Sequence, residues 1–525
     1  MTPRVDLAIV GSGFGGSLLA TIARKLGLSV VLLEKGVHPR FAIGESSSPL
    51  ANLLLESLCR RYGLSEIEPL AKWGTWQAAR PEIGCGKKRG FSFFHHTPGL
   101  EFGREPERRN ELLVEASPAD PVADTHWYRA DVDAFFARQA EAAGAELVDR
   151  IALDVFKPSS EGVRVGGVRS GRRLAWEARY LIDASGPRGF VHHTLGLDEK
   201  PFAHFPPTHG LYAHFHGVRR WEDVAPPAGR PPYAVDDAAL HHVFPGGWIW
   251  VLRFSNGVTS AGASLSPALA ERVGAAEGAA GWERLLGMLP SVGRQFEGSS
   301  AIRPFSSVAG MPYRTATADG PGWSMLPSAA AFVDPLLSTG FPLTLLGIER
   351  IALALEEAWG KRSWEERMAG SSRLTLEEAD RAALLVGALF DSFDDFELFS
   401  AVAMLYFASA SYAEARRRLG GPAQTFLSGR SGDDTGFRAA LETVADRVRG
   451  RDGGSFGLGE LIAGIRKAIA PLNVAGLLDP SRRNWYPVVP ADLLENAEKL
   501  EATRDEVGAL IARSGFPDSP DESRC

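Results

Sequence analysis

Near its beginning the chain reads Val5-Asp-Leu-Ala-Ile-Val10, an apolar run that leads directly into Gly11-Ser-Gly13-Phe-Gly15-Gly16. A short apolar run bounded by glycine predicts a buried strand. The pattern over residues 17–26 predicts a helix, and residues 28–33 predict a second buried strand that ends at the acidic residue Glu34. The order strand, glycine turn, helix, strand, acid predicts the nucleotide-binding unit of a doubly wound α/β fold.

The glycines of this turn have distinct physical roles. Gly11 permits the tight turn, Gly13 lets the backbone approach a pyrophosphate, and Gly16 lets the helix pack closely on the strand. The helix N-terminus then presents free N–H groups and the positive end of its dipole to the phosphates. Glu34 lies 18 residues after Gly16, close to the spacing of an acid that binds a ribose hydroxyl. A glycine turn within a signal peptide is disfavoured, because charged residues interrupt the run and no cleavage region follows.

The composition is that of an ordinary globular protein. Of the 525 residues, 45% are hydrophobic and 23% are charged, and the net charge of −7 gives no reason to expect nucleic-acid binding. Three cysteines (Cys59, Cys85 and Cys525) are too few for a disulfide framework and form no C-x-x-C pair, so we expect a reducing, cytoplasmic setting. No window of 18 uninterrupted apolar residues occurs, so no membrane span is expected. Glycine is enriched, at 57 residues, which indicates close backbone approach at several places.

Three further segments extend the nucleotide motif: residues 127–136, 181–187 and 329–340. They resemble, in order, the short helix with a flavin-contacting arginine, the second flavin motif and the last flavin motif of the glutathione-reductase-like class. The resemblance implies FAD rather than NAD. No second strand–glycine turn–helix unit follows, because the glycines of 162–171 predict a hairpin, so the chain shows no built-in site for a nicotinamide donor. The residues that the resemblance assigns to FAD are Gly11, Gly13, Gly16, Glu34, Arg129, Asp183, Gly186 and Asp334.

One run is more specific within this flavoprotein class. His38-Pro-Arg-Phe-Ala-Ile-Gly-Glu-Ser-Ser-Ser-Pro49 resembles the P-R-F-x-I-G-E-S-x-x-P segment of the flavin-dependent halogenases, which is a strap over the flavin. Gly247-Trp-Ile-Trp-Val-Leu-Arg253 resembles their W-x-W-x-I-P signature, in which Trp248 and Trp250 match and Arg253 replaces the proline. The resemblance assigns further FAD contacts to Arg40, Ile43, Gly44, Glu45 and Ser46.

Two other segments resemble the reactive parts of the same family. Lys87-Lys88-Arg89-Gly90 resembles the stretch with the catalytic lysine and gives that role to Lys88, with a solvated basic turn as the alternative. Ser338-Thr339-Gly340 resembles the loop whose last two residues hold the halide through backbone N–H groups, a geometry close to that of a helix N-cap. Leu337 stands where free-tryptophan halogenases have a glutamate, which favours the phenol- or carrier-directed branches.

The resemblance implies a reaction of reduced FAD (FADH2). Reduced flavin gives a hydroperoxide with oxygen, a halide attacks it, and the hypohalous acid released travels to an electron-rich phenol or pyrrole, free or carrier-bound. Lys88 would polarise the oxidant as an ammonium or form a haloamine as a neutral amine. Trp248 and Trp250 would keep the substrate away from the flavin. The implied partners are a chloride or bromide ion and a separate NAD(P)H-dependent flavin reductase.

Two departures from the family pattern leave other functions open. Pro327-Ser328 replaces the family's Gly-Asp, so Ser328 rather than a carboxylate would meet the ribityl chain, and Arg253 replaces the signature proline. A flavin-dependent monooxygenase or dehydrogenase without halide chemistry is therefore an alternative, as is a flavin-binding scaffold without turnover. No metal site is expected from the histidine pairs at 95–96, 192–193 and 241–242, because neighbouring side chains on a strand point to opposite faces.

For the whole chain we expect an α/β fold. A discontinuous FAD-binding Rossmann-like domain of the glutathione-reductase class spans 1–345, with an antiparallel substrate sheet inserted at about 75–125 and 200–305, and a helical C-terminal domain spans 346–525. Helices are predicted over 348–359, 376–398 and 401–419. Aromatic residues crowd between 390 and 412, where they either pack helix on helix or roof a substrate cavity.

Overall fold

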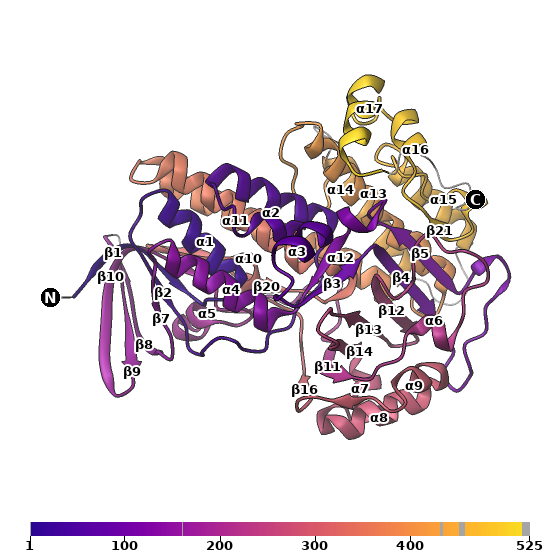
Figure 1. The fold of residues 1–525 in the computed structure, drawn as a ribbon, viewed down its shortest axis with the longest axis horizontal. Helices are drawn as coiled ribbons and strands as arrows, with labels where there is room; N and C mark the ends of the chain where they lie inside the picture. The colour runs from indigo at the N-terminus through magenta and orange to yellow at the C-terminus, as the bar shows by residue number, and fades with distance from the viewer. Residues whose placement is uncertain (1, 160, 431–433, 451–456, 517–525) are drawn as a thin grey trace.

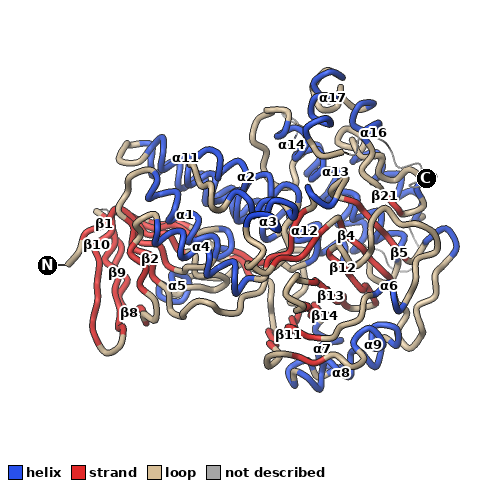
Figure 2. The backbone as a smooth tube through the Cα atoms, in the orientation of Figure 1, coloured by secondary structure: helices blue, strands red, loops and turns tan. Residues whose placement is uncertain are grey.

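Two large sheets and the helices that cover them make up the protein (Figure 1, Figure 2). The computed structural model describes residues 2–159, 161–430, 434–450 and 457–516. In Figure 2 the strands of the first sheet lie at the left, near the N-terminus, and those of the second sheet lie at the lower right. The two sheets share no strand among the residues described.

The N-terminal motif forms the centre of the first sheet. Strand β1 (Arg4–Val10) pairs in parallel with β2 (Val30–Leu33) on one side and with β10 (Arg172–Asp183) on the other, and both predicted strands are therefore present. Because these strands are parallel, their carboxyl ends lie at one edge of the sheet, where such folds bind ligands. The other strands are β7 (Glu146–Val148), β19 (Trp323–Met325), β18 (Asp319–Gly320) and the predicted hairpin of β9 (Gly162–Arg169) with β10, to which β8 (Ala152–Ser159) adds.

Helix α1 (Phe14–Lys25) packs on this sheet because two glycines leave room at the point of contact. A Cβ atom on Gly16 would lie 2.0 Å from the carbonyl oxygen of Gly11, and Gly11 itself has φ +100°. Helices α4 (Arg129–Ala142) and α11 (Gly340–Ala358) flank α1 on the same face of the sheet (Figure 2). The remaining helices of this part are α2 (Pro49–Tyr62), α3 (Trp73–Ala79), α5 (Phe190–Leu195) and α10 (Pro327–Ala330).

The second sheet has the order β15-β11-β14-β13-β12-β4-β5-β21, with β16 beside β11. It is antiparallel except that β4 pairs in parallel with β12 and β5 pairs in parallel with β21. Its strands are β4 (Gly90–His95), β5 (Glu111–Glu115), β11 (His209–His216), β12 (Ala239–Phe244), β13 (Gly247–Arg253), β14 (Thr259–Leu265), β15 (Ser300–Ala301), β16 (Ser306–Val308) and β21 (Trp485–Tyr486). The predicted antiparallel sheet is thus present, with two parallel pairings where strands from distant parts of the chain join it.

Helices also interrupt the segment 200–305, where only strands were expected. They are α6 (Trp221–Val224), α7 (Pro267–Val273), α8 (Ala279–Met288) and α9 (Pro290–Phe296), of which α7, α8 and α9 lie at the bottom of Figure 1. Pro267 and Pro290 each occupy the first position of a helix, where the missing N–H group costs nothing. Both prolines therefore begin helices.

Among the residues described, two small sheets and five 3₁₀ turns complete the part before α11, and one further turn lies later in the chain. Strand β3 (Cys85–Lys88) pairs with β6 (Asp124–Trp127), and β17 (Tyr313–Arg314) pairs with β20 (Ala331–Phe332). The turns, one of which lies later in the chain, are η1 (Glu68–Ala71), η2 (Pro106–Arg108), η3 (Asp120–Val122), η4 (Ala275–Glu277), η5 (Leu336–Ser338) and η6 (Pro480–Arg482).

The C-terminal part is mainly helical, as expected, but its helix boundaries differ. The single helix predicted over 376–398 is wrong: α12 (Ser363–Phe390) ends before Asp395, whose side chain caps α13 (Phe396–Arg418) by accepting a hydrogen bond from the N–H of Leu398. The later helices are α14 (Asp434–Arg449), α15 (Leu458–Ile469), α16 (Pro490–Glu495) and α17 (Arg504–Arg513). The domain boundary predicted after residue 345 falls inside α11, and β21 joins the C-terminal part to the second sheet.

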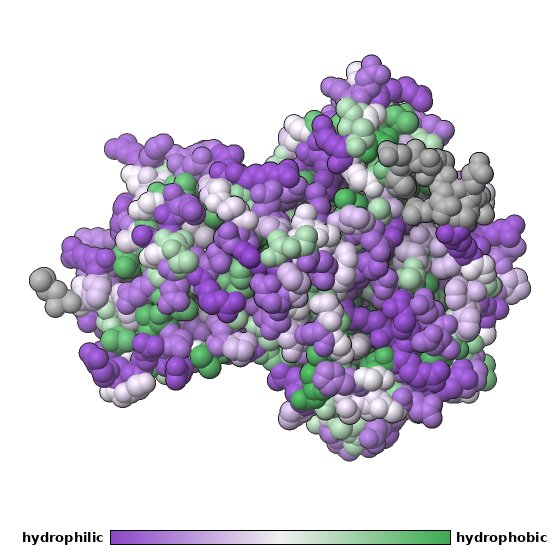
Figure 3. Space-filling view, viewed as in Figure 1, coloured by the Kyte–Doolittle hydropathy of each residue, from purple (hydrophilic) through white to green (hydrophobic). Residues whose placement is uncertain are grey.

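Two stretches of helix, Leu336–Ala358 and Phe396–Arg418, are long and apolar enough to cross a membrane by length and composition. In each, 78% of the apolar window is buried inside the protein, as in the core helices of folded domains. The face of the molecule seen in Figure 3 is mostly hydrophilic, with apolar residues in scattered groups. The burial of both stretches favours a role in the protein core.

Candidate active site

A cavity of about 600 Å³ lies at the carboxyl edge of the first sheet, between that sheet and β13 of the second. It is bounded by the glycine turn before α1, the 40–46 strap and the loop that precedes α11. Of the residues predicted to form the site, the cavity is lined by Gly13, Arg40, Ile43, Gly44, Glu45, Ser46, Arg129, Gly186, Trp248, Trp250, Ser328, Asp334, Thr339 and Gly340. Gly11, Gly16, Glu34, Asp183 and Lys88 lie outside its lining.

The turn before α1 has the form required to hold a dinucleotide. Gly13 is the N-cap residue and provides no side chain, so the first N–H groups of α1 have no partner within the helix. A Cβ atom on Gly13 would lie 3.6 Å from the guanidinium of Arg129 and 3.7 Å from that of Arg40. A helix N-terminus beside two guanidinium groups favours a polyanion such as a pyrophosphate. These residues fit FAD.

Glu34 lies next to this turn with its carboxylate already occupied. It accepts hydrogen bonds from the N–H of Ser12 at 2.9 Å, from the hydroxyl of Ser12 at 3.0 Å and from the N–H of Gly36 at 2.8 Å. Burial alone would raise the pKa of Glu34, but Arg40 and these donors outweigh burial and hold the pKa below its ordinary value. The ionised carboxylate ties the end of β2 to the glycine turn.

Asp183 and Arg129 also make their hydrogen bonds to other residues of the protein. Asp183 is fully buried and accepts hydrogen bonds from the N–H groups of Ser185 at 2.9 Å and Val191 at 2.7 Å, so it shapes the turn that contains Gly186. Arg129 forms a two-pronged ion pair with Asp133 at 2.8 and 2.9 Å. Its other nitrogen donates to the carbonyl oxygens of the strap at Ile43, 3.0 Å away, and Gly44, 2.9 Å away. Arg129 thus fixes the strap to α4 while one side of it faces the cavity.

The tryptophan signature and the last flavin motif are joined by a buried hydrogen bond. The indole N–H of Trp248 donates to Asp334 at 3.1 Å, and Asp334 also accepts from the hydroxyl of Ser264 at 2.6 Å and the N–H of Leu336 at 3.0 Å. Burial raises the pKa of Asp334 to about 7, and these three donors only partly offset it. Trp250, two residues on, lines the same side of the cavity as Trp248.

The loop between Asp334 and α11 has an unusual backbone. Leu337 has φ +62° and Ser338 has φ +56°, a left-handed conformation that costs non-glycine residues about 1–3 kcal/mol each. Thr339 returns to right-handed helical angles and starts α11. The backbone thus changes from the left-handed to the right-handed form between Ser338 and Thr339, just before α11 begins. Thr339 and Gly340 line the cavity at this point, where a helix start presents free N–H groups.

Lys88 lies beside this loop and is completely buried. Its ammonium donates to the hydroxyl of Ser46 at 2.9 Å, the carbonyl of Ser47 at 2.5 Å and the hydroxyl of Ser338 at 3.2 Å, and it lies 3.9 Å from the ring centre of Phe91. Burial lowers the pKa of the ammonium, and the carboxylate of Asp124 partly offsets that effect. At neutral pH a larger fraction of Lys88 is therefore in the neutral amine form than for a surface lysine.

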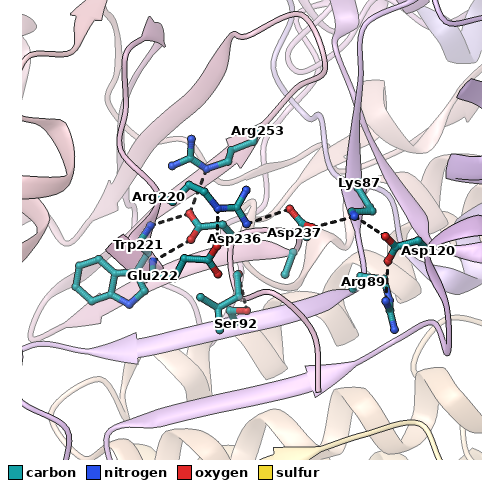
Figure 4. Close-up of polar contacts among 12 residues, drawn as sticks. Lys87, Arg89, Ser92, Asp120, Arg220, Trp221, Glu222, Asp236, Asp237 and Arg253 are labelled. Atoms are coloured by element: carbon teal, nitrogen blue, oxygen red, sulfur yellow. Dashed lines mark hydrogen bonds and ion pairs between the residues drawn. The ribbon is translucent and has the colours of Figure 1, made fainter. Parts of the chain in front are cut away.

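The basic neighbours of Lys88 point the other way. Lys87 forms ion pairs with Asp120 at 2.6 Å and Asp237 at 3.0 Å, and Arg89 with Asp120 at 2.7 Å (Figure 4). Because side chains alternate along a strand, these partners leave Lys88 on the inner face of β3. The segment is therefore not a solvated basic turn, since Lys88 is completely buried, Arg89 is buried and Lys87 is ion-paired.

Arg253, the departure from the tryptophan signature, belongs to the same outer network. Its guanidinium pairs with Asp236 at 3.1 Å and donates to the carbonyl of Val218 at 3.0 Å (Figure 4). Asp236 also accepts from the N–H of Trp221 at 2.9 Å, so the network fixes the start of α6. The side chain of Arg253 does not line the cavity.

A second cavity, of about 180 Å³, lies on the far side of Lys88. The rings of Phe91, Tyr406 and Phe407 form its apolar wall, and residues between Val474 and Phe516 close another side. Its polar lining residues are Ser48, Lys72, Glu115, Ser117, Asp124, Ser411, Glu414, Arg418, Arg513 and Ser514. Lys88 separates the two cavities, since Ser46 and Ser338 line the first and Phe91 lines the second.

Comparison with known proteins decides the family. No model of a protein family matches the chain. The tetracycline 7-halogenase of Kitasatospora aureofaciens is 30% identical over 444 residues, which cover 83% of this chain and 78% of that protein. This chain belongs to the flavin-dependent halogenases. The monodechloroaminopyrrolnitrin halogenase PrnC of Pseudomonas fluorescens is 28% identical over 408 residues, 76% of this halogenase and 70% of PrnC.

The halogenase also shares its fold with a solved relative. The crystal structure of halogenase PltM in complex with phloroglucinol and FAD superposes with a TM-score of 0.80 at 23% identity, over 91% of this chain and 99% of that one. The expected α/β fold of a FAD-binding enzyme is thus confirmed, and FAD, used in its reduced form, is the cofactor of the halogenase.

Several residues of this site were not predicted from the sequence. Asp124 and Glu414 lie in none of the motifs. The crowd of aromatic residues between 390 and 412 is divided, since Tyr406 and Phe407 line the second cavity while Phe393 and others pack in the core. The pairs His95–His96 and His241–His242 lie on strands, and His241 lines the first cavity with burial lowering its pKa to about 3, so the ring is neutral. Within the described residues, no group of three or more His, Cys, Asp or Glu is placed to hold a metal ion.

Proposed function

We propose that this halogenase installs chlorine or bromine on an electron-rich phenol or pyrrole, free or carrier-bound, with FADH2 supplied by a separate NAD(P)H-dependent flavin reductase. The observation that carries the proposal is the position of Lys88. Its buried ammonium contacts Ser338, in the loop between Asp334 and α11, on one side and the ring of Phe91, in the wall of the second cavity, on the other. The relatives support the aromatic class, since PltM was solved with phloroglucinol and another relative is named as a brominase of a carrier-bound 1H-pyrrole-2-carbonyl group.

The first cavity is where we place the cofactor. The N-terminus of α1 with Gly13 and Arg40 would bind the pyrophosphate, Ser328 the ribityl chain, and the strap from Ile43 to Ser46 would cover the ring system. Gly11, Gly16, Glu34, Arg129, Asp183 and Asp334 would support this cavity through the contacts described. When bound, reduced FAD supplies the two electrons with which oxygen and halide give hypohalous acid.

The residues of the chain then divide the remaining tasks. The N–H groups of Thr339 and Gly340 hold the halide, because the free N–H groups at the start of a helix attract anions. Trp248 and Trp250 exclude the substrate from the first cavity. Lys88 holds hypohalous acid by its ammonium and gives a proton to its oxygen, which leaves as water while the aromatic carbon takes the halogen. The ring carbon then loses its own proton, which balances the one that Lys88 gave. Its lowered pKa eases that proton transfer.

The alternative, a flavin-dependent monooxygenase or dehydrogenase without halide chemistry, gains no support from the two sequence departures. Arg253 makes its ion pair away from the cavity, and Ser328 still lines it with a hydroxyl. Neither change alters the loop between Asp334 and α11 or Lys88. We expect the halogenase to act in the cytoplasm, where NAD(P)H for the reductase is available.

The experiment is a coupled assay with purified protein, FAD, a flavin reductase, NADH, oxygen and a panel of phenols and pyrroles, run with chloride, with bromide and without either. The proposal predicts products heavier by one halogen only when a halide is present. An oxygenated or desaturated product that forms equally without halide would support the alternative, and FAD binding without any product would indicate a scaffold.

A further inference from the structure

Asp124, which lines the second cavity, has one carboxylate oxygen without a hydrogen-bond donor among the residues described. The side chain is 4% exposed, and one of its oxygens accepts a hydrogen bond from the amide of Asn52 at 2.8 Å. The other oxygen is buried and has no hydrogen-bond partner among the residues described. A buried carboxylate oxygen without a donor is costly, by about 1–3 kcal/mol or more. A donor group on a ligand in the cavity, or an ordered water, satisfies such an atom.

The other carboxylates that line this cavity are already paired. Glu115 accepts from Arg89 at 2.6 Å and from the N–H of Val488 at 2.8 Å. Glu414 forms an ion pair with Arg418 at 2.8 Å. Asp124 differs from both, since one of its oxygens has no donor within the described part of the chain and the residue lines this cavity together with the rings of Phe91 and Tyr406.

The position of Asp124 relative to Lys88 is fixed by strand register. Asp124 on β6 stands directly opposite Lys88 on β3, so the two side chains leave the same face of the small sheet. The carboxylate and the ammonium attract one another across this face. An aromatic ring that is bound at Asp124 therefore lies close to the side chain of Lys88.

From these contacts we infer that Asp124 binds the substrate by accepting a hydrogen bond from a hydroxyl or N–H group on the aromatic ring. This inference rests on the proposed function and names the substrate class more closely, as an aromatic that carries a donor group on or beside the ring. The hydrogen bond orients the ring, and it raises the electron density of the ring because the donor atom gains negative character. The small volume of about 180 Å³ suits a substrate with one such ring, since cavities of this size hold benzene. Sequence patterns gave no sign of this role, because Asp124 lies in none of the motifs.

The test compares a phenol with its methyl ether, which has the same ring but no donor. We expect the parent halogenase to favour the phenol by at least about tenfold in kcat/KM, the size of one hydrogen bond to a charged group. In Asp124→Asn this preference should fall to within about twofold. In Asp120→Asn, a carboxylate that pairs with Lys87 and Arg89 outside the cavity, the preference should persist.

Hypohalous acid released by each protein is measured in parallel with a diffusible 1,3-diketone as the halogen trap. Halide-dependent reaction of the trap by the parent upholds the proposed function, and its absence, with no halogenated phenol, overturns that function. If the trap reacts but Asp124→Asn keeps the phenol preference, the role of Asp124 alone is overturned. If Asp124→Asn does not fold, as judged by FAD binding, calorimetry on the parent decides: about tenfold tighter binding of the phenol supports the role, and equal binding of phenol and ether contradicts it.

Discussion

Lys88 and Ser338 are in direct contact: the ammonium donates a hydrogen bond to the serine hydroxyl at 3.2 Å, although the residues are 250 positions apart. Ser46 closes a triangle, since it accepts from Lys88 at 2.9 Å and from Ser338 at 3.0 Å. One buried cluster therefore connects the strap, the lysine strand and the loop that starts α11. The cluster links the position of the Lys88 ammonium to that of the loop to which we assign halide binding.

Ser338→Ala should lower halogenation with little effect on FAD binding. The change removes one acceptor of the buried ammonium, which costs about 1.5–3 kcal/mol for a hydrogen bond to a charged group, or about ten- to a hundredfold in rate if the loss falls on the transition state. Coupled halogenation kinetics and flavin titration are the measurements. Equal rates for the parent and Ser338→Ala would show that the contact does not serve the reaction.

Trp248→Phe should weaken halide binding, because the indole N–H that steadies Asp334 at 3.1 Å is lost and Asp334 anchors the loop. We expect a loss of about 1–3 kcal/mol in unfolding free energy together with a raised KM for chloride or bromide. Trp176→Phe is the matched control, because its indole also donates to a carboxylate at 3.1 Å, that of Glu146 in the first sheet. If the KM for halide rises in both variants, the rise reflects a general loss of stability and not the contact between Trp248 and Asp334.

The stability of the protein should fall as the pH rises from about 4 to about 7 through the titration of Asp334. The folded state raises the pKa of this carboxyl from 3.8 to about 7, so between these values it binds a proton more often than the unfolded chain does, and the stabilisation is lost as pH rises. The loss is at most about 4 kcal/mol. Unfolding of parent and Asp334→Asn across this pH range checks it; parallel pH profiles for the two proteins would contradict the assignment.

Two glycines of the first turn should separate folding from cofactor binding. A Cβ on Gly16 would lie 2.0 Å from the carbonyl of Gly11, so Gly16→Ala must push α1 off the sheet and lower the melting temperature even without FAD. A Cβ on Gly13 meets nothing within 3.6 Å, so Gly13→Ala should keep its melting temperature and lose FAD affinity. Thermal unfolding without FAD and flavin titration measure the two effects. Similar melting temperatures for both variants would contradict this division.

The N-terminal unit could be predicted from the sequence because its constraints are local. The strand at 5–10, the glycine turn and Glu34 all follow from neighbouring residues, and they lie where the spacing places them. The family signatures could be recognised for the same reason. What their residues contact is a different matter: Asp183 and Glu34 shape turns, and Trp248 bonds to Asp334, 86 residues later.

The features that were missed depend on pairings between distant segments. Asp124 stands opposite Lys88 only because β6 pairs with β3, and β21 completes the second sheet only because Trp485 pairs beside Leu113. The break between α12 and α13 depends on the cap at Asp395, which the helical periodicity on either side conceals. Local propensity has no access to such contacts, which are decided by packing.

The most direct test of the account is halogenation by Lys88→Met compared with Lys87→Met. Both variants remove one ammonium from adjacent positions, but Lys88 is buried between the two cavities and Lys87 forms ion pairs on the outer face. We predict that Lys88→Met loses at least about a hundredfold in halide-dependent product, in the range for loss of a general acid, while it binds FAD normally, and that Lys87→Met retains most of its activity. Undiminished halogenation by a folded Lys88→Met protein would contradict the account.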